Sequence, residues 1–123
     1  MSTATMTTRQ VFEDYINTLS GKPKTEELVK RYVTDPELLE HIRVVEAGFP
    51  SYSLDVHETV VEGNTLAIRA TFHGTHKGEF AGVAPTGRTV SAELMAFYWL
   101  ENGHVVKFWI QVDTAGLIGQ LTK

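Results

Sequence analysis

The sequence predicts an α+β fold, with helices first and a curved antiparallel sheet after them. Up to about residue 48, apolar residues recur at the three-to-four spacing of amphipathic helices. From residue 51 onward they alternate with polar residues, as in strands. Later, Asn102-Gly103 separates two apolar runs, and this dipeptide is typical of a two-residue hairpin turn. Because helices and strands do not alternate along the chain, an antiparallel sheet is favoured over a parallel one.

Three helices are expected in the first half. Their boundaries follow from capping residues and helix breakers: the first spans residues 8–19 after Thr7 or Thr8, a short second opens at Thr25, and the third starts after Asp35 and runs to Gly48. Strands are expected near residues 52–61 and 66–72, and the hairpin covers residues 89–113. Residues 114–121 are expected to form a frayed helical turn. The length of 123 residues fits one domain over residues 1–123.

The hairpin turn predicts which side chains share a face, since side chains alternate along a strand. Pairing Glu101 with His104 places one set on the first face: Leu100, Val105, Tyr98, Lys107, Ala96, Trp109, Leu94, Gln111, Ala92 and Asp113. The second face then carries Trp99, Val106, Phe97, Phe108, Met95, Ile110, Glu93 and Val112. Both faces are largely apolar, so each should be covered.

The first face combines apolar side chains with a few polar ones, which is typical of a ligand cavity. The more apolar second face is suited to a partner subunit, through Met95, Phe97, Trp99, Phe108 and Ile110. The alternative is that both faces belong to the core of one domain.

Composition excludes several classes of function. The net charge is −4 and the basic residues are scattered, so nucleic acid is not an expected partner. There are no cysteines, which excludes disulfides, thiolate catalysis and sulfur ligands for a metal. No apolar run is long enough to span a bilayer and no secretory signal is evident, so we expect a cytoplasmic protein without membrane contact.

Two motifs carry little chemistry. Residues 82–89 resemble a phosphate-binding loop, but such a loop needs a helix after it, and here a strand is expected. The histidines are not at helical metal-ligand spacing, so no metal site is expected.

Asp113 and His41 are the candidate proton carriers. Asp113 follows the last strand, where neighbouring apolar side chains would desolvate it and raise its pKa. An aspartate at a strand-to-helix boundary is equally typical of an N-cap. His41 lies on the third predicted helix near Leu38 and Ile42, where it either points into the concave side of the sheet or is a hydrogen-bonded core residue.

The second half of the chain resembles the SnoaL-like polyketide or ester cyclases. The motifs that carry the resemblance are residues 74–82, 85–88 and 101–106, followed by Trp109, Asp113, Gly116-Leu117 and Gln120-Leu121. The resemblance implies an NTF2-like cone, in which a curved antiparallel sheet wraps around helices and encloses a deep apolar pocket. It also implies a dimer formed through the outer face of the sheet.

The same resemblance implies a chemistry without metal or redox cofactor. Asp113 would act as general acid or base in an intramolecular aldol closure of a small apolar carbonyl compound. Tyr15, His41, Trp109 and Gln111 would line the pocket, beside Tyr98 and Leu94 of the first hairpin face. Lys107 is a departure, because many relatives carry glutamate there; a lysine near Asp113 would hold it ionised and favour a base.

Two functions are therefore considered. The first is a cyclase-like, cofactor-independent acid–base enzyme, related to isomerases and lyases. The second is a non-catalytic module of the same fold that binds a small apolar ligand or serves in dimeric assembly, because one fold hosts many functions.

Overall fold

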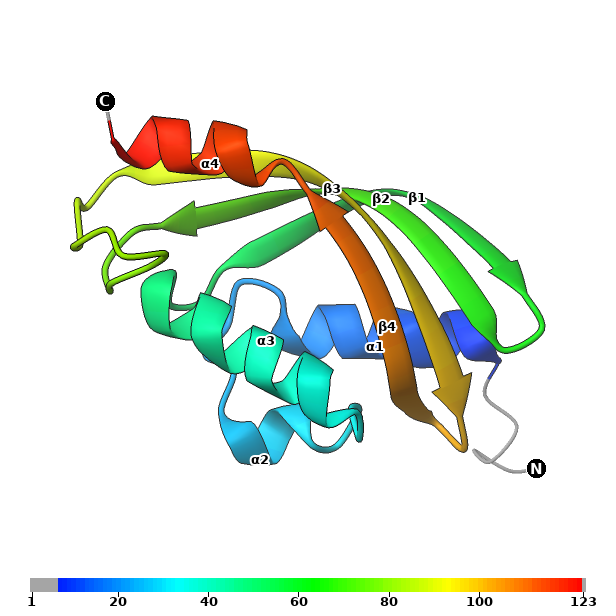
Figure 1. Cartoon of the computed structure of the whole chain (residues 1–123). Coiled ribbons are helices and arrows are strands. Elements are labelled where there is room, and N and C mark those ends of the chain that lie inside the picture. Colours follow the sequence, from blue (N-terminus) through cyan, green and yellow to red (C-terminus); the bar gives the residue numbers. More distant parts are fainter. Residues whose placement is uncertain (1–6, 123) are drawn as a thin grey trace.

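The structure, a computed structural model, describes residues 7–122. The elements, in chain order, are α1 (Thr8–Leu19), α2 (Glu26–Val29), α3 (Pro36–Gly48), β1 (Ser53–Glu62), β2 (Thr65–Thr75), β3 (Thr89–Glu101), β4 (His104–Val112) and α4 (Thr114–Leu121). The four strands form one antiparallel sheet in the order β1-β2-β3-β4. The sheet is strongly curved, and α1 and α3 lie against its concave side (Figure 1). The predicted α+β fold is confirmed.

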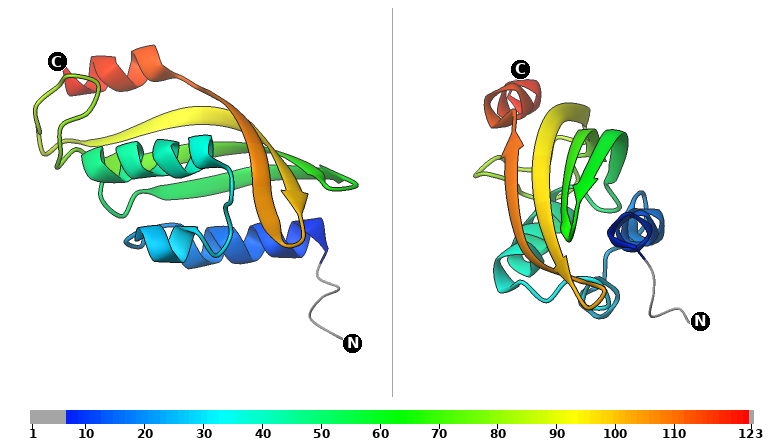
Figure 2. Two further views of the ribbon diagram at one scale, coloured as in Figure 1. Left: turned by 60° about the horizontal axis from the view of Figure 1, so that its bottom comes forward. Right: turned by 90° about the vertical axis from the view of Figure 1, so that its right-hand side faces the viewer.

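Local sequence signals fix the ends of the helices. Thr7 caps α1 in a capping box with Gln10, and the Asp35 side chain caps α3 ahead of Pro36 at its first turn. The apolar faces of both helices are buried against the sheet, with Phe12, Tyr15 and Leu19 on α1 and Leu38 and Ile42 on α3. Figure 2 shows the two helices and the sheet from two further directions. No described helix is both long and apolar enough to cross a membrane.

The β3–β4 hairpin begins as predicted and then departs from the predicted register. Asn102 and Gly103 both have positive φ, 53° and 78°, and Glu101 pairs with His104 as expected. Between Leu100↔Val105 and Trp99↔Lys107, however, the register shifts by one residue. Val106 is the extra residue of a β-bulge, and beyond it every side chain of β4 faces the opposite way from the prediction.

The predicted faces of β4 were therefore wrong. Phe108, Ile110 and Val112 are paired with Tyr98, Ala96 and Leu94 and face the concave side, whereas the prediction placed Phe108 and Ile110 on the outer face. Lys107, Trp109 and Gln111 are paired with Trp99, Phe97 and Met95 on the convex side, whereas the prediction placed them in the pocket. The assignment for β3 holds, since Leu94 and Tyr98 are buried and Met95 and Phe97 are exposed.

The loop between β2 and β3 closes the narrow end of the molecule. The carbonyl oxygen of Gly48 accepts hydrogen bonds from the backbone N–H groups of Lys77 and Gly78, each at 3.1 Å. His76 is fully buried, and its Nδ1 accepts a hydrogen bond from the Thr86 backbone N–H at 3.1 Å. These bonds hold the loop so that Phe80 packs against Phe49, with ring centroids 5.0 Å apart.

The last element is a complete short helix and not the frayed turn that was predicted. Asp113 is its N-cap, and its Oδ1 accepts a hydrogen bond from the Gly116 backbone N–H at 2.9 Å. Leu117 and Leu121 are buried, so α4 packs its apolar side on the end of the sheet. Asp113 is therefore engaged at the helix terminus, with its side chain exposed.

Replacing Gly78 should destabilise the fold. A Cβ atom at this position would lie 2.0 Å from the carbonyl oxygen of Ala47, so Gly78→Ala is expected to lower the free energy of unfolding by about 1–3 kcal/mol. Gly119→Ala is the control, because nothing lies within 4 Å of the added Cβ and alanine favours the helix by about 0.5–1 kcal/mol. Urea unfolding of both variants checks this, and equal stabilities would contradict it.

Two replacements of Asp113 should distinguish its role as a helix cap from an effect of its negative charge. Asp113→Ala removes the oxygen that accepts from Gly116 and is expected to cost about 1 kcal/mol of stability, whereas Asp113→Asn keeps a capping oxygen and should be near neutral. Thermal melting of the two variants measures the difference. A loss of the same size in Asp113→Asn would show that the carboxylate acts by its charge and not as a cap.

Candidate functional site

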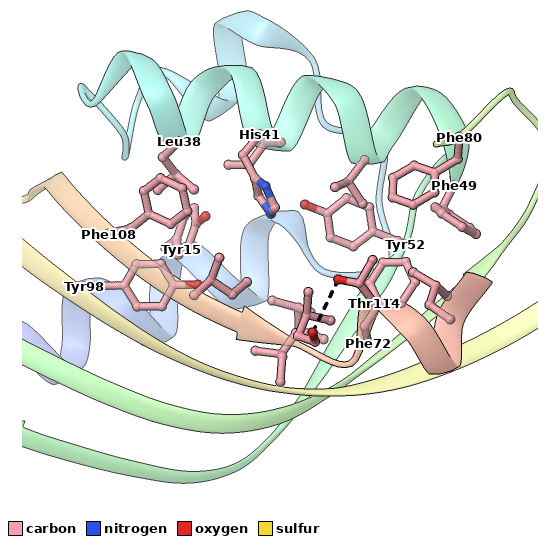
Figure 3. Close-up of a pocket in the computed structure, with 17 residues that line it drawn as sticks. Tyr15, Leu38, His41, Phe49, Tyr52, Phe72, Phe80, Tyr98, Phe108 and Thr114 are labelled. Atoms are coloured by element: carbon pink, nitrogen blue, oxygen red, sulfur yellow. Dashed lines mark hydrogen bonds between the residues drawn. The ribbon is translucent and has the colours of Figure 1, made fainter. Parts of the chain in front are cut away.

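A cavity of about 100 Å³ lies between the concave side of the sheet and α3. Its lining is drawn in Figure 3 and is mostly aromatic and aliphatic. The lining residues are Tyr15, Leu38, His41, Ile42, Val45, Phe49, Tyr52, Leu54, Phe72, Phe80, Leu94, Tyr98, Phe108, Ile110, Val112, Thr114 and Leu117. An apolar hollow with a few convergent polar groups is the usual form of a small-molecule site.

Each wall of the cavity comes from a different element. Its inner wall is α1 and β3, whose Tyr15 and Tyr98 are both buried, with ring centroids 6.4 Å apart. The narrow end is closed by Phe49, Phe72 and Phe80, and the Phe49 ring packs edge to face against each of the other two. Most of the lining residues that are only half-buried belong to α3 and β4, so the cavity opens to solvent between these two elements.

The polar groups in the cavity are one imidazole, three phenols and one hydroxyl: His41, Tyr15, Tyr52, Tyr98 and Thr114. Figure 3 shows the His41 ring projecting from α3 into the cavity, with the hydroxyl end of Tyr52 directed toward it. The Thr114 hydroxyl donates to the Val112 carbonyl oxygen at 3.4 Å. None of the lining side chains is a carboxylate, an ammonium or a guanidinium group.

Burial sets the protonation states of these groups. Desolvation lowers the pKa of His41 from its ordinary 6.5, so its imidazole is neutral at pH 7 and available as a proton acceptor. Desolvation raises the pKa of Tyr15, Tyr52 and Tyr98 above the ordinary value for a phenol. The three phenols therefore keep their protons at neutral pH and can donate hydrogen bonds.

Tyr52 is held in place by a charge cluster behind the cavity. The Lys24 ammonium lies 3.9 Å from the centroid of the Tyr52 ring and donates to the Tyr52 carbonyl oxygen at 2.6 Å. It also donates to the Lys22 carbonyl oxygen and to Glu46, and only 3% of its side chain is exposed. Glu46 in turn accepts from the backbone N–H of Ser51 at 3.0 Å. This cluster joins the end of α3 to the start of β1.

The structure brings together four of the residues predicted for the site. His41, Tyr15, Tyr98 and Leu94 line the cavity. Trp109, Gln111 and Lys107 lie on the convex side because of the Val106 bulge, and the Lys107 ammonium lies 4.9 Å from the centroid of the Trp99 ring. Asp113 lies outside the cavity, in a shallow groove of the convex side with Glu93 and Arg69.

Several lining residues were not predicted as part of a site. Phe108 and Ile110 were assigned to the other face, and both line the cavity instead, with the ring centroids of Phe108 and His41 5.6 Å apart. The polar residues of β4 gave a usable signal, because Lys107, Gln111 and Asp113 alternate with apolar ones, as in a strand with one solvated face. Tyr52 was predicted only as the first residue of a strand and not as part of a site; in the structure it precedes β1, which begins at Ser53, and it lines the cavity.

No cluster of three or more His, Cys, Asp or Glu side chains within residues 7–122 is arranged to hold a metal ion. His57 bonds to Thr71 at 2.6 Å on the exposed side of the sheet, and buried His76 is bonded to the loop.

Solved structures with the same fold cover nearly the whole chain. A candidate SnoaL-like polyketide cyclase from Jannaschia sp. CCS1 aligns with a TM-score of 0.80 at 17% identity, over 99% of this chain and 96% of that one. A SnoaL-like polyketide cyclase from Agrobacterium tumefaciens C58 aligns at 0.75 and 20% identity, over 94% and 98%. AclR from Streptomyces galilaeus, named as a candidate hydroxylase, aligns at 0.77 and 23% identity, over 93% and 80%. At these identities the likeness shows the fold alone.

No curated protein matches the sequence. The family model for SnoaL-like polyketide cyclases matches residues 12–121, which include all of the cavity lining. The chain therefore belongs to the SnoaL-like polyketide cyclase family.

Proposed function

We propose that this protein is an acid–base enzyme that removes a proton from the carbon next to a carbonyl group of a small apolar compound, as in an aldol-type closure or an isomerase or lyase step. The observation that supports the proposal best is a desolvated histidine facing three neutral phenols in an apolar cavity. A base and hydrogen-bond donors in one dry site are what enolate formation requires.

His41 is the proposed base. Its imidazole is reachable from the mouth of the cavity between α3 and β4, and desolvation keeps it neutral at pH 7. No hydrogen bond joins its ring to another described side chain, so both ring nitrogens remain available to a substrate. A neutral imidazole in contact with the Phe108 ring can take up a proton from carbon and return it.

The phenols are the proposed partners of the carbonyl oxygen. As the proton leaves, negative charge develops on that oxygen, and a donor already in place stabilises it without reorganisation. Tyr15, Tyr52 and Tyr98 converge on the cavity from α1, the segment before β1 and β3. Their raised pKa values ensure that they approach the oxygen as donors and not as anions.

This assignment differs from the one that the family resemblance implied. Asp113 was expected to carry the proton, but its side chain caps α4 and lies outside the cavity. A general base must lie within hydrogen-bond reach of the proton that it removes. We therefore place the proton transfer on His41, the second predicted carrier.

A binding module without catalysis is the second candidate function. It is favoured by one observation: among the residues that the structure describes, no carboxylate contacts the His41 ring to orient it, as catalytic histidines often require. In that case the cavity would hold a ligand without changing it.

Proton exchange distinguishes the two functions. With acetophenone as probe in D₂O, the protein should catalyse loss of the methyl proton signal, followed by NMR. His41→Gln should slow this exchange about 100-fold or more, since a positioned base contributes about 10²–10⁴ in rate. The rate should be level above pH 6.5 and fall at lower pH, because protonated His41 cannot accept a proton and its pKa lies below 6.5.

Two variants serve as controls for this experiment. His73→Gln removes an exposed histidine of β2, and Asp113→Asn changes the cap residue; both should exchange at the wild-type rate. Binding of the probe with no exchange would identify a binding module. Exchange that is lost in Asp113→Asn and kept in His41→Gln would overturn the assignment of the base.

The convex side of the sheet is proposed to bind a second copy of the chain. Met95, Phe97 and Trp109 are 54%, 41% and 46% exposed there, which is unusual for large apolar side chains gathered on one face. Charges of both signs flank them, with Lys107 toward one end of β4 and Glu93, Asp113 and Arg69 toward the other. In a twofold interface whose axis is perpendicular to the strands, each end meets the opposite end of the partner, so that Lys107 would face the carboxylates of Glu93 and Asp113.

A charge placed on this face should dissociate the dimer. Trp109→Glu buries a carboxylate in the proposed interface and is expected to give monomers at micromolar concentration, as measured by sedimentation equilibrium. Val44→Glu alters an exposed apolar residue of α3, away from the sheet, and should leave the dimer intact. A wild-type protein that sediments as a monomer would contradict the proposal.

A further inference from the structure

We infer that the cavity selects an uncharged carbonyl compound of about the size of a single ring, in place of a fused polycyclic or anionic one. The inference rests on the proposed function in one respect, namely that this cavity is the site where the ligand binds. Four properties of the cavity support it: its volume, the tight packing of its closed ends, the absence of charge in its lining, and the phenol donors beside His41.

The volume limits the ligand to about one ring. The cavity measures about 100 Å³, and the hollow behind it, bounded by Lys24 and Tyr52, adds only about 20 Å³. For comparison, an engineered apolar cavity of about 150 Å³ binds benzene. A compound of three or four fused rings would need several times this space.

The closed ends of the cavity leave little room for expansion. At the narrow end, Gly48 and Gly74 are packed so tightly that an added Cβ would lie 2.9 Å from the Cβ atoms of Phe80 and Phe49. At the back, the Lys24 ammonium pins the ring and the carbonyl group of Tyr52. Widening is therefore confined to the side between α3 and β4, where Phe108 stands.

The lining offers no charge to an anionic ligand. The ammonium group of Lys24 lies behind the cavity, and its three N–H donors are already used by the carbonyl oxygens of Lys22 and Tyr52 and by Glu46. His41 is neutral at pH 7 and the tyrosines keep their protons. An unpaired carboxylate would lose its hydration in this cavity without gaining a counterion, which is strongly unfavourable.

The polar groups that remain fit a carbonyl oxygen. Three phenol donors converge on the space beside His41, whereas an apolar lining offers nothing to further polar groups of a ligand. A carbonyl oxygen on an otherwise apolar ring can accept from two of these donors, and it leaves no polar group of the ligand unpaired.

A matched set of probes tests the inference. Acetophenone and benzoate have the same ring and the same number of heavy atoms, but only benzoate is charged at pH 7.5; anthrone is an uncharged tricyclic ketone. Binding is followed by methyl NMR shifts of Leu38, Ile42, Leu94 and Ile110, which line the cavity. Acetophenone should shift these signals, benzoate should bind more than about 100-fold more weakly, and anthrone should not bind.

A variant at Phe108, on the open side of the cavity between α3 and β4, extends the test. Phe108→Ala should widen the mouth and admit anthrone while keeping the preference for acetophenone over benzoate; a melting curve establishes that the variant is folded. Benzoate binding as tight as acetophenone binding, anthrone binding to the wild-type cavity, or no shift with any probe would each overturn the inference. Acetophenone binding without proton exchange would leave it standing and overturn only the proposed catalysis.

Discussion

The bulge at Val106 determines the chemistry available to this molecule. A strand that passes one extra residue through its pairing reverses the direction of every side chain beyond it. Here the reversal turns Phe108, Ile110 and Val112 toward the helices and leaves Lys107 and Trp109 outside. Without the bulge, an ammonium group and an amide would face the concave side, and the cavity could not be both apolar and uncharged.

The protonation states in the cavity follow from the exclusion of water. Desolvation lowers the pKa of His41 and raises the pKa of the three tyrosines, so that both kinds of group are neutral. The imidazole can then accept a proton, and the phenols can donate hydrogen bonds. The buried ion pair of Lys24 and Glu46 supports this arrangement from behind, since it places its charges against backbone carbonyl groups and outside the cavity. AclR, a structure of the same fold, is named as a candidate hydroxylase. The fold alone therefore does not identify a reaction, and the site has to.

The sequence was sufficient for features that depend on neighbouring residues. Thr7 and Asp35 cap their helices as expected, and Asn102-Gly103 forms the expected turn, because each signal acts within a few residues. The sequence was insufficient for features that depend on contacts between segments far apart in the chain. The bulge follows Val105, whose backbone is hydrogen-bonded to Tyr32 and Thr34 in the first half of the chain. Buried His76 is hydrogen-bonded to Thr86, ten residues away. The spacing in the sequence was compatible with Asp113 either as an N-cap or as a cavity residue. In the structure Asp113 is the N-cap of α4.

The distribution of aromatic residues has a practical consequence for spectroscopy. The chain has two tryptophans, and both Trp99 and Trp109 stand on the convex side, whereas Tyr15, Tyr52 and Tyr98 surround the cavity. Indole emission thus reports on the convex side of the sheet, whereas three of the four phenol groups lie around the cavity; the fourth, Tyr32, is half-buried and bonded to Asp14. The two kinds of aromatic chromophore therefore report mainly on opposite sides of the sheet.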